Sequence, residues 1–333
     1  MKRLLQTVAA AALLGIGLAS GAAAQTIQLK ASHQWPGGTG DMRDEMVQII
    51  AWEVNSADVG LEIRVFPGAS LFKPTDQWNA MIKGQLDITA FPLDYAGGKH
   101  PQFHITLMPG LVKNHEHARR LNDSPFMQEI KKIMEEAGVI VLADTWLAGG
   151  FASKQNCILE PDDIKGQVTR AAGAAFEEML AAAGASIASM PSSEIYTGMQ
   201  TGVLDATNTS SESFVSYRLY EQVKCITAPG ENALWFMYEP ILMSKRSFER
   251  LNEEQQKAIM AAAAKAEEFA YQAAKESDAN MIEVFEKAGV EVVTMTAEQA
   301  QMWRDVAANS SYKSFAEKVP GGRELLDMAL AVE

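Results

Sequence analysis

Alternating hydrophobic and polar positions predict short strands separated by helices in the first half of the chain. Over residues 26–32, Ile27, Leu29 and Ala31 fall on one side, as in a strand with one buried face. Further strands are predicted at 61–66, 86–91 and 139–142. Helices are predicted at 41–54, with Asp41 as the N-cap, and at 77–83, 115–121 and 124–136. Strands that alternate with helices across short turns favour an α/β fold with a parallel sheet.

The same alternation resumes after Gly149 and ends in one long helical segment. Strands are predicted around Arg170 and at 186–190, 203–207 and 236–242, and helices at 176–183 and 193–200. Residues 252–288 are rich in alanine and contain no Pro or Gly, which predicts a helix about 55 Å long. That length exceeds one small domain, so we expect the helix to pack against two domains. A coiled coil is the alternative, although sustained Leu/Ile heptads are missing.

Residues 1–24 have the pattern of a secretory signal peptide. Lys2 and Arg3 precede an apolar stretch at 4–20, and three alanines at 22–24 suit cleavage. An uncleaved membrane anchor is the alternative interpretation. Cleavage would leave 333 − 24 = 309 residues, which is enough for two domains. The sequence therefore predicts a mature protein in the periplasm.

Composition and charge narrow the classes of partner. Hydrophobic residues make up 47% of the chain and charged residues 21%, as in an ordinary globular protein. Lys and Arg number 29 against 42 Asp and Glu, and the net charge of -13 repels nucleic-acid phosphates and anionic lipids. We therefore expect no nucleic-acid partner. A small anionic ligand is still compatible, because a local cationic pocket can override a diffuse field.

The two cysteines, Cys157 and Cys225, belong to a chain predicted to enter a compartment that permits disulfides. They form either one bridge or two buried thiols, and we favour the bridge. Neither has neighbours at zinc-ligand spacing. His115 and His117 flank Glu116, but helical residues two positions apart point in different directions, which favours a solvated surface. The sequence therefore predicts no metal site and no cofactor.

Signatures of common hydrolases and nucleotide-binding proteins are missing from the sequence. There is no G-x-S-x-G, no P-loop and no H-E-x-x-H. His100 and His104 could share a helical face, but Pro101 between them disfavours a regular helix, and a structural role is the better interpretation. No base and activated partner occur at a recognisable spacing. The pattern favours binding over catalysis.

Arg170 is the strongest candidate for a binding residue. It ends a predicted strand and precedes small residues at 171–174, which would leave its guanidinium open to a cleft. The planar donors of Arg match a carboxylate bidentately, which suits capture of an organic anion. A salt bridge to one of the 42 acidic residues is the alternative. Asn208 follows the predicted strand 203–207 and either completes the pocket or is a turn residue.

Aromatic residues gather at the ends of predicted strands. They are Trp35, Trp146 with Phe151, and Trp235 with Phe236 and Tyr238. Strand ends are where α/β sheets bind ligands, and aromatic rings supply apolar walls or stacking platforms. We therefore predict that Trp35, Trp146, Phe151 and Trp235 line the ligand pocket. Core packing is the alternative for each of them.

Four stretches resemble the extracytoplasmic solute-binding subunits of tripartite ATP-independent periplasmic (TRAP) transporters. They are 86–91 (LDITAF), 107–111 (LMPGL), 161–170 and, as the most specific, 190–205 (MPSSEIYTGMQTGVLD). The resemblance covers essentially the whole chain. It implies two α/β domains around a cleft, crossing hinge strands, a long helix that spans both domains, and a membrane permease as partner. It also implies that Arg170 is the carboxylate-binding arginine of the family.

The chain departs from the family's pattern at the second carboxylate contact. Where many members have Glu-Asn-Pro, this sequence has Asn208-Thr209-Ser210, so the contact falls on Asn208 or Thr209. The acidic residue that helps to hold a metal in keto-acid binders is missing here, which argues against a bound cation. No second arginine occurs at 149–153, although Lys154 is close. A single arginine favours a monocarboxylate over a dicarboxylate.

These observations predict an α/β periplasmic binding protein with two domains, 25–148 plus 236–275 and 149–235 plus 276–333. Its expected ligand is a small organic monocarboxylate, such as a uronate, an aldonate, or a hydroxy or aromatic acid. The alternative is a secreted lyase or hydrolase that uses His33 or a carboxylate as base. An exported structural adaptor without a small ligand is the third possibility.

Overall fold

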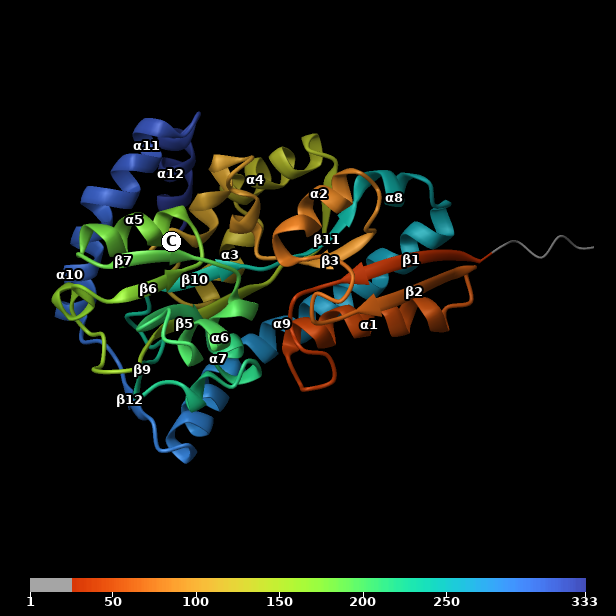
Figure 1. Ribbon diagram of the computed structural model, residues 1–333. Coiled ribbons are helices and arrows are strands. Elements are labelled where there is room, and N and C mark those ends of the chain that lie inside the picture. The colour runs from red at the N-terminus through yellow and green to blue at the C-terminus, as the bar shows by residue number, and fades with distance from the viewer. Residues whose placement is uncertain (1–25) are drawn as a thin grey trace, which may run out of the picture.

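The computed structural model describes residues 26–333, and the predicted signal peptide 1–24 lies outside them. Two sheets with helices on their faces make up two lobes (Figure 1). The first sheet has the order β2-β1-β3-β11-β4 and defines the first lobe. Its strands are β1 (Ile27–Ser32), β2 (Leu61–Phe66), β3 (Ile88–Ala90), β4 (Val139–Ala143) and β11 (Ile241–Ser244).

The second sheet has the order β12-β9-β5-β8-β6-β7, with β10 also paired to β5, and defines the second lobe. Its strands are β5 (Trp146–Ser153), β6 (Val168–Ala171), β7 (Ser186–Ser189), β8 (Ala206–Ser210), β9 (Cys225–Thr227), β10 (Trp235–Tyr238) and β12 (Glu291–Val293). The predicted class, an α/β fold with two lobes, is confirmed.

The chain crosses between the sheets three times, at 144–145 from β4 to β5, at 239–240 from β10 to β11, and through the helices that connect β11 to β12. The predicted single strand at 236–242 is therefore two strands in different sheets, because Glu239 and Pro240 interrupt it. Both sheets are mixed and not purely parallel, since β11 runs antiparallel to β3 and β4, and β5 antiparallel to β8, β9 and β10. The predicted domain bounds stay a prediction.

Twelve α-helices surround the sheets in the described part of the chain. They are α1 (Met42–Ser56), α2 (Gln77–Ile82), α3 (His115–Asn122), α4 (Pro125–Glu136), α5 (Ala174–Ala182), α6 (Ile195–Gln200), α7 (Ser211–Ser216), α8 (Lys245–Glu249), α9 (Glu253–Lys287), α10 (Ala297–Ala307), α11 (Lys313–Lys318) and α12 (Gly322–Leu330). The side chain of Asp41 caps α1, as expected from the sequence. None of these helices is long and apolar enough to cross a bilayer.

Helix α9 confirms the predicted long helix, with bounds one residue shorter at each end. Its 35 residues extend about 52 Å and run diagonally across both lobes (Figure 1). Asn252 and Gln255 form a capping box at its start. A stripe of buried alanines, including Ala263, Ala266 and Ala270, lets α1 and the crossing strands approach closely. The helix therefore joins both lobes on one side of the molecule.

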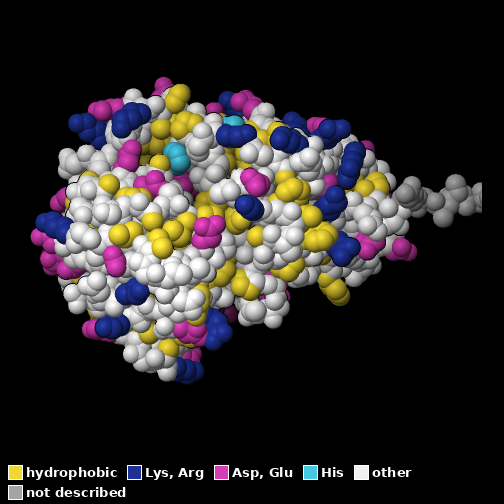
Figure 2. Space-filling model, viewed as in Figure 1, with side chains coloured by type: hydrophobic (Ala, Val, Ile, Leu, Met, Phe, Trp, Pro, Cys, Tyr) yellow, Lys and Arg dark blue, Asp and Glu magenta, His cyan; other side chains and the backbone are white. Residues whose placement is uncertain are grey.

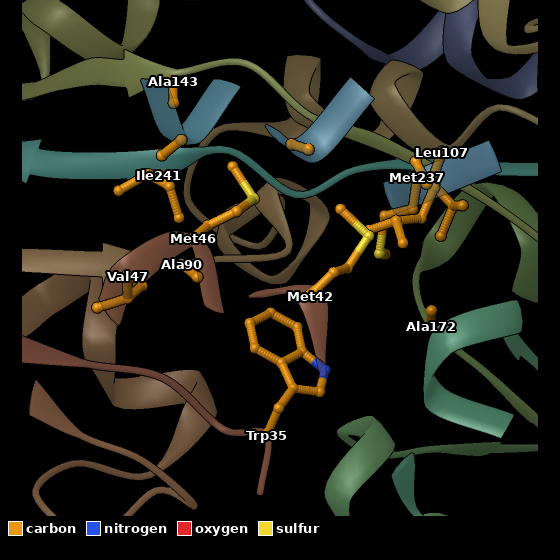
Figure 3. Packing of buried hydrophobic residues seen from close by; sticks show 14 of the residues in the cluster. Trp35, Met42, Met46, Val47, Ala90, Leu107, Ala143, Ala172, Met237 and Ile241 are labelled. Carbon is orange, nitrogen blue, oxygen red and sulfur yellow. The ribbon is translucent and has the colours of Figure 1, made fainter. Parts of the chain in front are cut away.

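The hydrophobic core is continuous from one lobe to the other. Trp35 and Met42 of the first lobe belong to the same buried cluster as Ala172 and Met237 of the second (Figure 3). Hydrophobic side chains also lie along the junction at the surface (Figure 2). The structure thus shows the lobes packed against each other, so the junction between them is where a site would be enclosed.

Candidate functional site

Arg170 lies at the junction of the lobes with its side chain only 1% exposed. Strand β6 ends there, paired to β7 and β8 on either side. The guanidinium donates from Nε to the Met190 carbonyl at 2.9 Å, from Nη1 to the Asn208 carbonyl at 2.8 Å, and from Nη2 to the Tyr95 hydroxyl at 3.2 Å. The loop after β7, strand β8 and Tyr95 of the first lobe therefore fix its position.

All three acceptors around Arg170 are neutral oxygens. Within residues 26–333 no carboxylate forms an ion pair with it, and two of the five N–H donors of a guanidinium are left over. A charge buried without a counter-ion costs several kcal/mol, about as much as breaking a buried ion pair. The geometry is therefore suited to an anion that comes from outside the chain.

Asn208, on β8, is completely buried, and neither its Oδ1 nor its Nδ2 finds a hydrogen-bond partner in the described part of the chain. Thr209 is the next residue, and successive side chains of a strand point to opposite faces. Asn208 pairs in register with Phe151, and Thr209 with Gly150. An unpaired buried amide is costly, and a ligand that offers one donor and one acceptor would satisfy it.

Trp35 and Trp235 belong to the continuous core, and Trp235 also lines, with Phe151, a cavity of about 270 Å³ in the second lobe. The indole N–H groups of Trp35 and Trp235 are buried and have no acceptor within residues 26–333. Trp35 places its ring 4.0 Å from the guanidinium carbon of Arg43. Trp235 covers Gly149, where a Cβ would come within 2.6 Å of the ring. Both indoles are therefore unused donors in the part of the core that the two lobes share.

The other two predicted aromatic residues are engaged elsewhere. Trp146 donates from Nε1 to the Asn122 side chain at 2.8 Å and lines a cavity of about 310 Å³ between α3 and α9. Phe151 stacks on Trp303 of α10, with ring centroids 5.3 Å apart. The carboxyl ends of parallel strands lie at one edge of a sheet, but Trp146 is the first residue of β5 and lies against α9. The structure does not bring these two rings to Arg170.

Sequence reasoning missed two residues that the structure places in the junction. Both polar side-chain atoms of Gln34 are buried without partners among the described residues. The Tyr95 hydroxyl accepts from Arg170 and also from the Ser192 backbone N–H at 3.0 Å. Gln34 follows β1 and Tyr95 follows β3, at the carboxyl ends of parallel strands. Their position after these strands could have identified both residues from the sequence, because α/β sheets bind ligands at the carboxyl ends of their strands.

A recess of about 380 Å³ opens between the lobes beside Arg170. Its walls include Asp94, Tyr95 and His104 from the first lobe, and Gly173, Glu177 and Met190 from the second. Arg170 lies directly behind this wall, because Tyr95 and Met190 both bond to its guanidinium. The lobes touch at Gly173, where a Cβ would lie only 1.4 Å from Asp94 Oδ2. The two lobes can therefore approach this closely only because residue 173 is a glycine.

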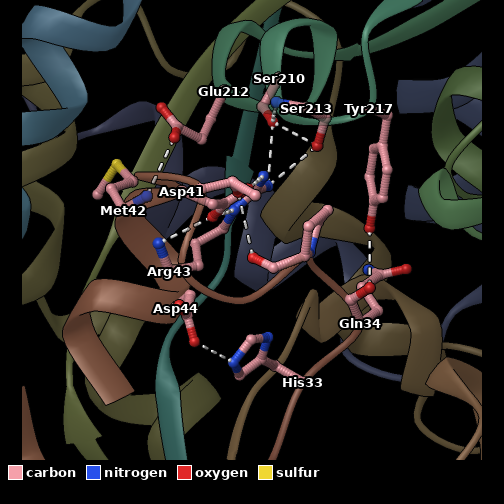
Figure 4. A network of polar contacts seen from close by, with 12 residues as sticks. His33, Gln34, Asp41, Met42, Arg43, Asp44, Ser210, Glu212, Ser213 and Tyr217 are labelled. Atoms are coloured by element: carbon pink, nitrogen blue, oxygen red, sulfur yellow. Dashed lines mark hydrogen bonds and ion pairs between the residues drawn. The ribbon is translucent and has the colours of Figure 1, made fainter. Parts of the chain in front are cut away.

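The second buried guanidinium of the junction, Arg43, is satisfied within the protein (Figure 4). It donates to both Asp41 oxygens at 2.9 and 2.7 Å, to Glu239 at 2.9 Å, and to the hydroxyls of Ser210 and Ser213. Burial alone would lower the pKa of Arg43, but Asp41 and Glu239 outweigh burial and raise it. Arg43 thus holds the two lobes together through partners of its own, whereas two N–H donors of Arg170 have no partner among the described residues.

The cysteines and histidines have structural partners. Cys157 and Cys225 form a disulfide with Cα atoms 5.1 Å apart, which ties the start of β9 to the segment after β5. Their sulfurs lie near Glu291, the single possible metal-ligand group among the described residues, but bridged sulfurs are not thiolate ligands. His115 pairs with Asp278, and His117 bonds to the Val332 carbonyl, so the two imidazoles do not converge. No cofactor-binding cluster is apparent within 26–333.

Two lobes joined by crossing strands, with a buried arginine that has no carboxylate partner among the described residues, form the architecture of a two-lobed binding protein. The chain belongs to the bacterial extracellular solute-binding protein family 7, which it matches over residues 53–318, and thus to the TRAP solute-binding proteins. This confirms the resemblance seen in the sequence.

Several relatives are similar over almost their whole length. A solute-binding protein of Albidiferax ferrireducens is 41% identical over 310 residues, 92% of each chain. A TRAP periplasmic solute binding protein of Rhodoferax ferrireducens, crystallised with bound malonate, is 40% identical with a TM-score of 0.87, over 90% of this chain and 96% of the other. The 2,3-diketo-L-gulonate-binding periplasmic protein of Escherichia coli is 26% identical over 80% of each chain.

Proposed function

We propose that this protein is the periplasmic receptor of a TRAP transporter, and that it captures a small organic monocarboxylate and delivers it to a membrane permease. The observation that carries the proposal is the buried Arg170 guanidinium, whose protein partners are all neutral. A ligand carboxylate would supply the missing charge through the two remaining N–H donors. The malonate bound to the Rhodoferax ferrireducens relative supports a carboxylate ligand, but malonate is a dicarboxylate, so the preference for a monocarboxylate rests on the site residues alone.

Buried polar groups without partners support a ligand with hydroxyl or carbonyl groups beyond its carboxylate, and one of them, Asn208, also contacts Arg170 through its carbonyl. Gln34, Asn208 and the indoles of Trp35 and Trp235 offer donors and acceptors without charge. We propose Asn208 over Thr209 as the second contact, because both polar atoms of its side chain are unpaired.

A second carboxylate would find no uncommitted cation beside these groups. Arg43 is already bound by Asp41 and Glu239, and the recess carries the acidic side chains of Asp94 and Glu177. This arrangement favours a monocarboxylate such as an aldonate or a uronate over a dicarboxylate.

The alternative of a secreted lyase or hydrolase gains no support from the site. His33, the histidine considered as a base, bonds through Nε2 to Asp44 of α1 at 3.0 Å and is completely buried. The family that the chain belongs to consists of receptors for transporters. Capture and release by movement of the lobes explain the site without a chemical step.

Export and the permease belong to the same proposal. The pattern of residues 1–24 predicts cleavage and release into the periplasm, where the Cys157–Cys225 disulfide would persist. Several relatives are periplasmic proteins by name. Closure around the ligand would bring surfaces of both lobes into one fixed arrangement, which a membrane permease can recognise.

A thermal-shift panel tests the proposed ligand class. We expect D-erythronate, D-galacturonate or pyroglutamate to raise the melting temperature more than malonate, succinate or L-malate at equal concentration. A ligand at a hundredfold excess over its Kd adds about 2.7 kcal/mol of stability, or roughly 5 °C for a chain of this size. If dicarboxylates give the largest shifts, the monocarboxylate assignment is wrong. If no organic acid shifts the protein, the proposed function is wrong.

A further inference from the structure

Three carboxylates and one guanidinium form a buried cluster between the two lobes (Figure 4). Asp41 and Arg43 come from the start of α1 in the first lobe, Glu239 from the crossing between β10 and β11, and Glu212 from α7 in the second lobe. Asp41 is 1% exposed, Glu239 3% and Glu212 8%, and Arg43 is fully buried. The cluster therefore holds one positive charge against three acidic groups.

Glu212 is the acidic group that Arg43 leaves unpaired. Arg43 donates its hydrogen bonds to Asp41, Glu239 and two serine hydroxyls. Within the described residues, the hydrogen bond to Glu212 comes from the Met42 backbone N–H at 3.0 Å, across the junction of the lobes. The N-terminus of α1 supplies only a partial positive charge there. An ionised Glu212 is thus poorly compensated while the lobes are closed.

The environment of the closed junction favours the protonated form of Glu212. Burial is the largest cause, and the neighbouring Asp41 and Glu239 add to it, so the pKa of Glu212 is raised to about 7 despite opposition from Arg43 and Met42 N–H. Burial also raises the pKa of Glu239, which lies close enough to Arg43 to be partly compensated. A proton shared in this cluster is therefore expected to reside on Glu212.

Other groups packed against α7 do not supply the missing charge. On α9, the Asp278 carboxylate accepts from Ser211 and pairs with His115 at 2.8 Å. The Tyr217 phenol is neutral at ordinary pH, because burial raises its pKa well above the usual range. Arg170 acts on Glu239, where it lowers the pKa, and it is reserved for the ligand in the proposed function. None of these groups therefore supplies a positive charge to Glu212, and the acidic groups of the cluster still outnumber its single guanidinium.

We propose that closure of the lobes takes up one proton at Glu212, so that ligand capture by this protein is linked to proton binding. Opening moves α7 away from Asp41 and α1 and returns Glu212 to water, where a Glu titrates near its ordinary value. The closed form then binds the proton more tightly than the open form does. The inference rests on the proposed function, since it treats ligand capture and closure as one event.

The sign of the pH dependence follows from the raised pKa. Below the ordinary value of 4.5, Glu212 is protonated in both forms and closure is most favourable. Between that value and about 7, only the closed form is protonated, so affinity falls as pH rises, by up to about tenfold per pH unit. Above about pH 7.5 both forms are ionised and affinity is constant.

Isothermal titration calorimetry with the acid that gives the largest thermal shift tests the proposal. For the wild type, we expect Kd to rise at least about fivefold from about pH 5.5 to 7.5, and two buffers of different ionisation enthalpy to report uptake of close to one proton near pH 6. For Glu212→Gln, which keeps the acceptor for Met42 but not the titration, we expect a change of less than about twofold.

Glu267→Gln is the matched control. Glu267 lies on α9, and burial raises its pKa as well. It accepts a hydrogen bond from the Asp144 backbone N–H and lines the cavity between α3 and α9, so it is not a member of the junction cluster. This variant is expected to keep the pH dependence of the wild type. Affinity of the wild type that is independent of pH, or a dependence that survives in Glu212→Gln, overturns the proposal and leaves the proposed function standing.

A measurement without ligand separates the two claims. Spin labels on Lys83→Cys in the first lobe and Lys165→Cys in the second would occupy exposed positions. We expect their separation to shift toward the closed distance at about pH 5.5 relative to about pH 8.5, and this shift to vanish when Glu212→Gln is added. If no organic acid binds in the calorimetric titration, the proposed function is wrong. If the distance distribution without ligand does not change with pH, the proton-linked closure is wrong.

Discussion

Replacing Arg170 with Ala is expected to weaken binding of the tightest organic acid at least about thirtyfold. Truncating one partner of a buried, hydrogen-bonded charge pair costs about 2–5 kcal/mol, and in the complex the ligand carboxylate would be that partner. Isothermal titration calorimetry measures the loss.

Two further variants make the Arg170 result specific. Arg170→Lys keeps the positive charge but cannot hold a carboxylate bidentately, so its affinity should lie between those of the wild type and Arg170→Ala. Arg323→Ala removes an exposed arginine at the start of α12 and should bind as the wild type does. An Arg170→Ala protein that binds within about threefold of the wild type would show that the anion is held elsewhere.

Removing the disulfide is expected to cause the largest loss of stability among these changes. The Cys157–Cys225 bridge closes a loop with a sequence separation of 68 residues, and loops of this size stabilise a fold by about 2–4 kcal/mol. The bridge also secures β9, which connects β12 at the sheet edge to β5. The free energy of unfolding of Cys157→Ser/Cys225→Ser, measured in urea, should fall by that amount.

The reduced wild type is the control for the disulfide prediction. Unfolding under a thiol reductant should show the same loss as the double variant, since both lack the bridge, and the reductant should leave the double variant unchanged. Because the bridge lies in the second lobe, away from Arg170, we expect the folded double variant to keep its ligand affinity. Equal stability of the double variant and the oxidised wild type would contradict the account.

Features that depend on neighbouring residues were predictable from the sequence. The alanine-rich segment before Gly289 predicted α9 within one residue at each end, because it contains no Pro or Gly and is rich in good helix formers. Asp41 was identified as the cap of α1 for the same reason. Arg170 stood out because it ends a strand and small residues follow it.

Features that depend on contacts between distant segments could not be predicted in this way. The mixed sheets arise because the chain crosses between the lobes at Thr145 and again at Pro240, and a local pattern does not record direction. Trp146 and Trp235 looked equivalent at strand ends, yet one bonds to Asn122 and the other lies between the lobes. The pairing of Arg43 with Glu239 joins residues 196 positions apart.

The two buried arginines of the junction differ in their partners. Arg43 is held by Asp41, Glu239 and the serine hydroxyls of the second lobe, so it can keep the lobes together without an anion. Arg170 has only neutral acceptors among the described residues, and in the proposed function the solute supplies its counter-ion. The negative charge of the whole chain does not prevent capture of an anion, because Arg170 faces it at short range.

A crystal structure of the wild type with the tightest acid of the panel is the most direct test of the central claim. The account predicts a ligand carboxylate between the lobes, with its oxygens about 2.7–3.2 Å from the Arg170 guanidinium nitrogens. A second polar atom of the ligand should bond to the Asn208 amide. An acid bound in the cavity between α3 and α9, with Arg170 still without an anion, would contradict the account.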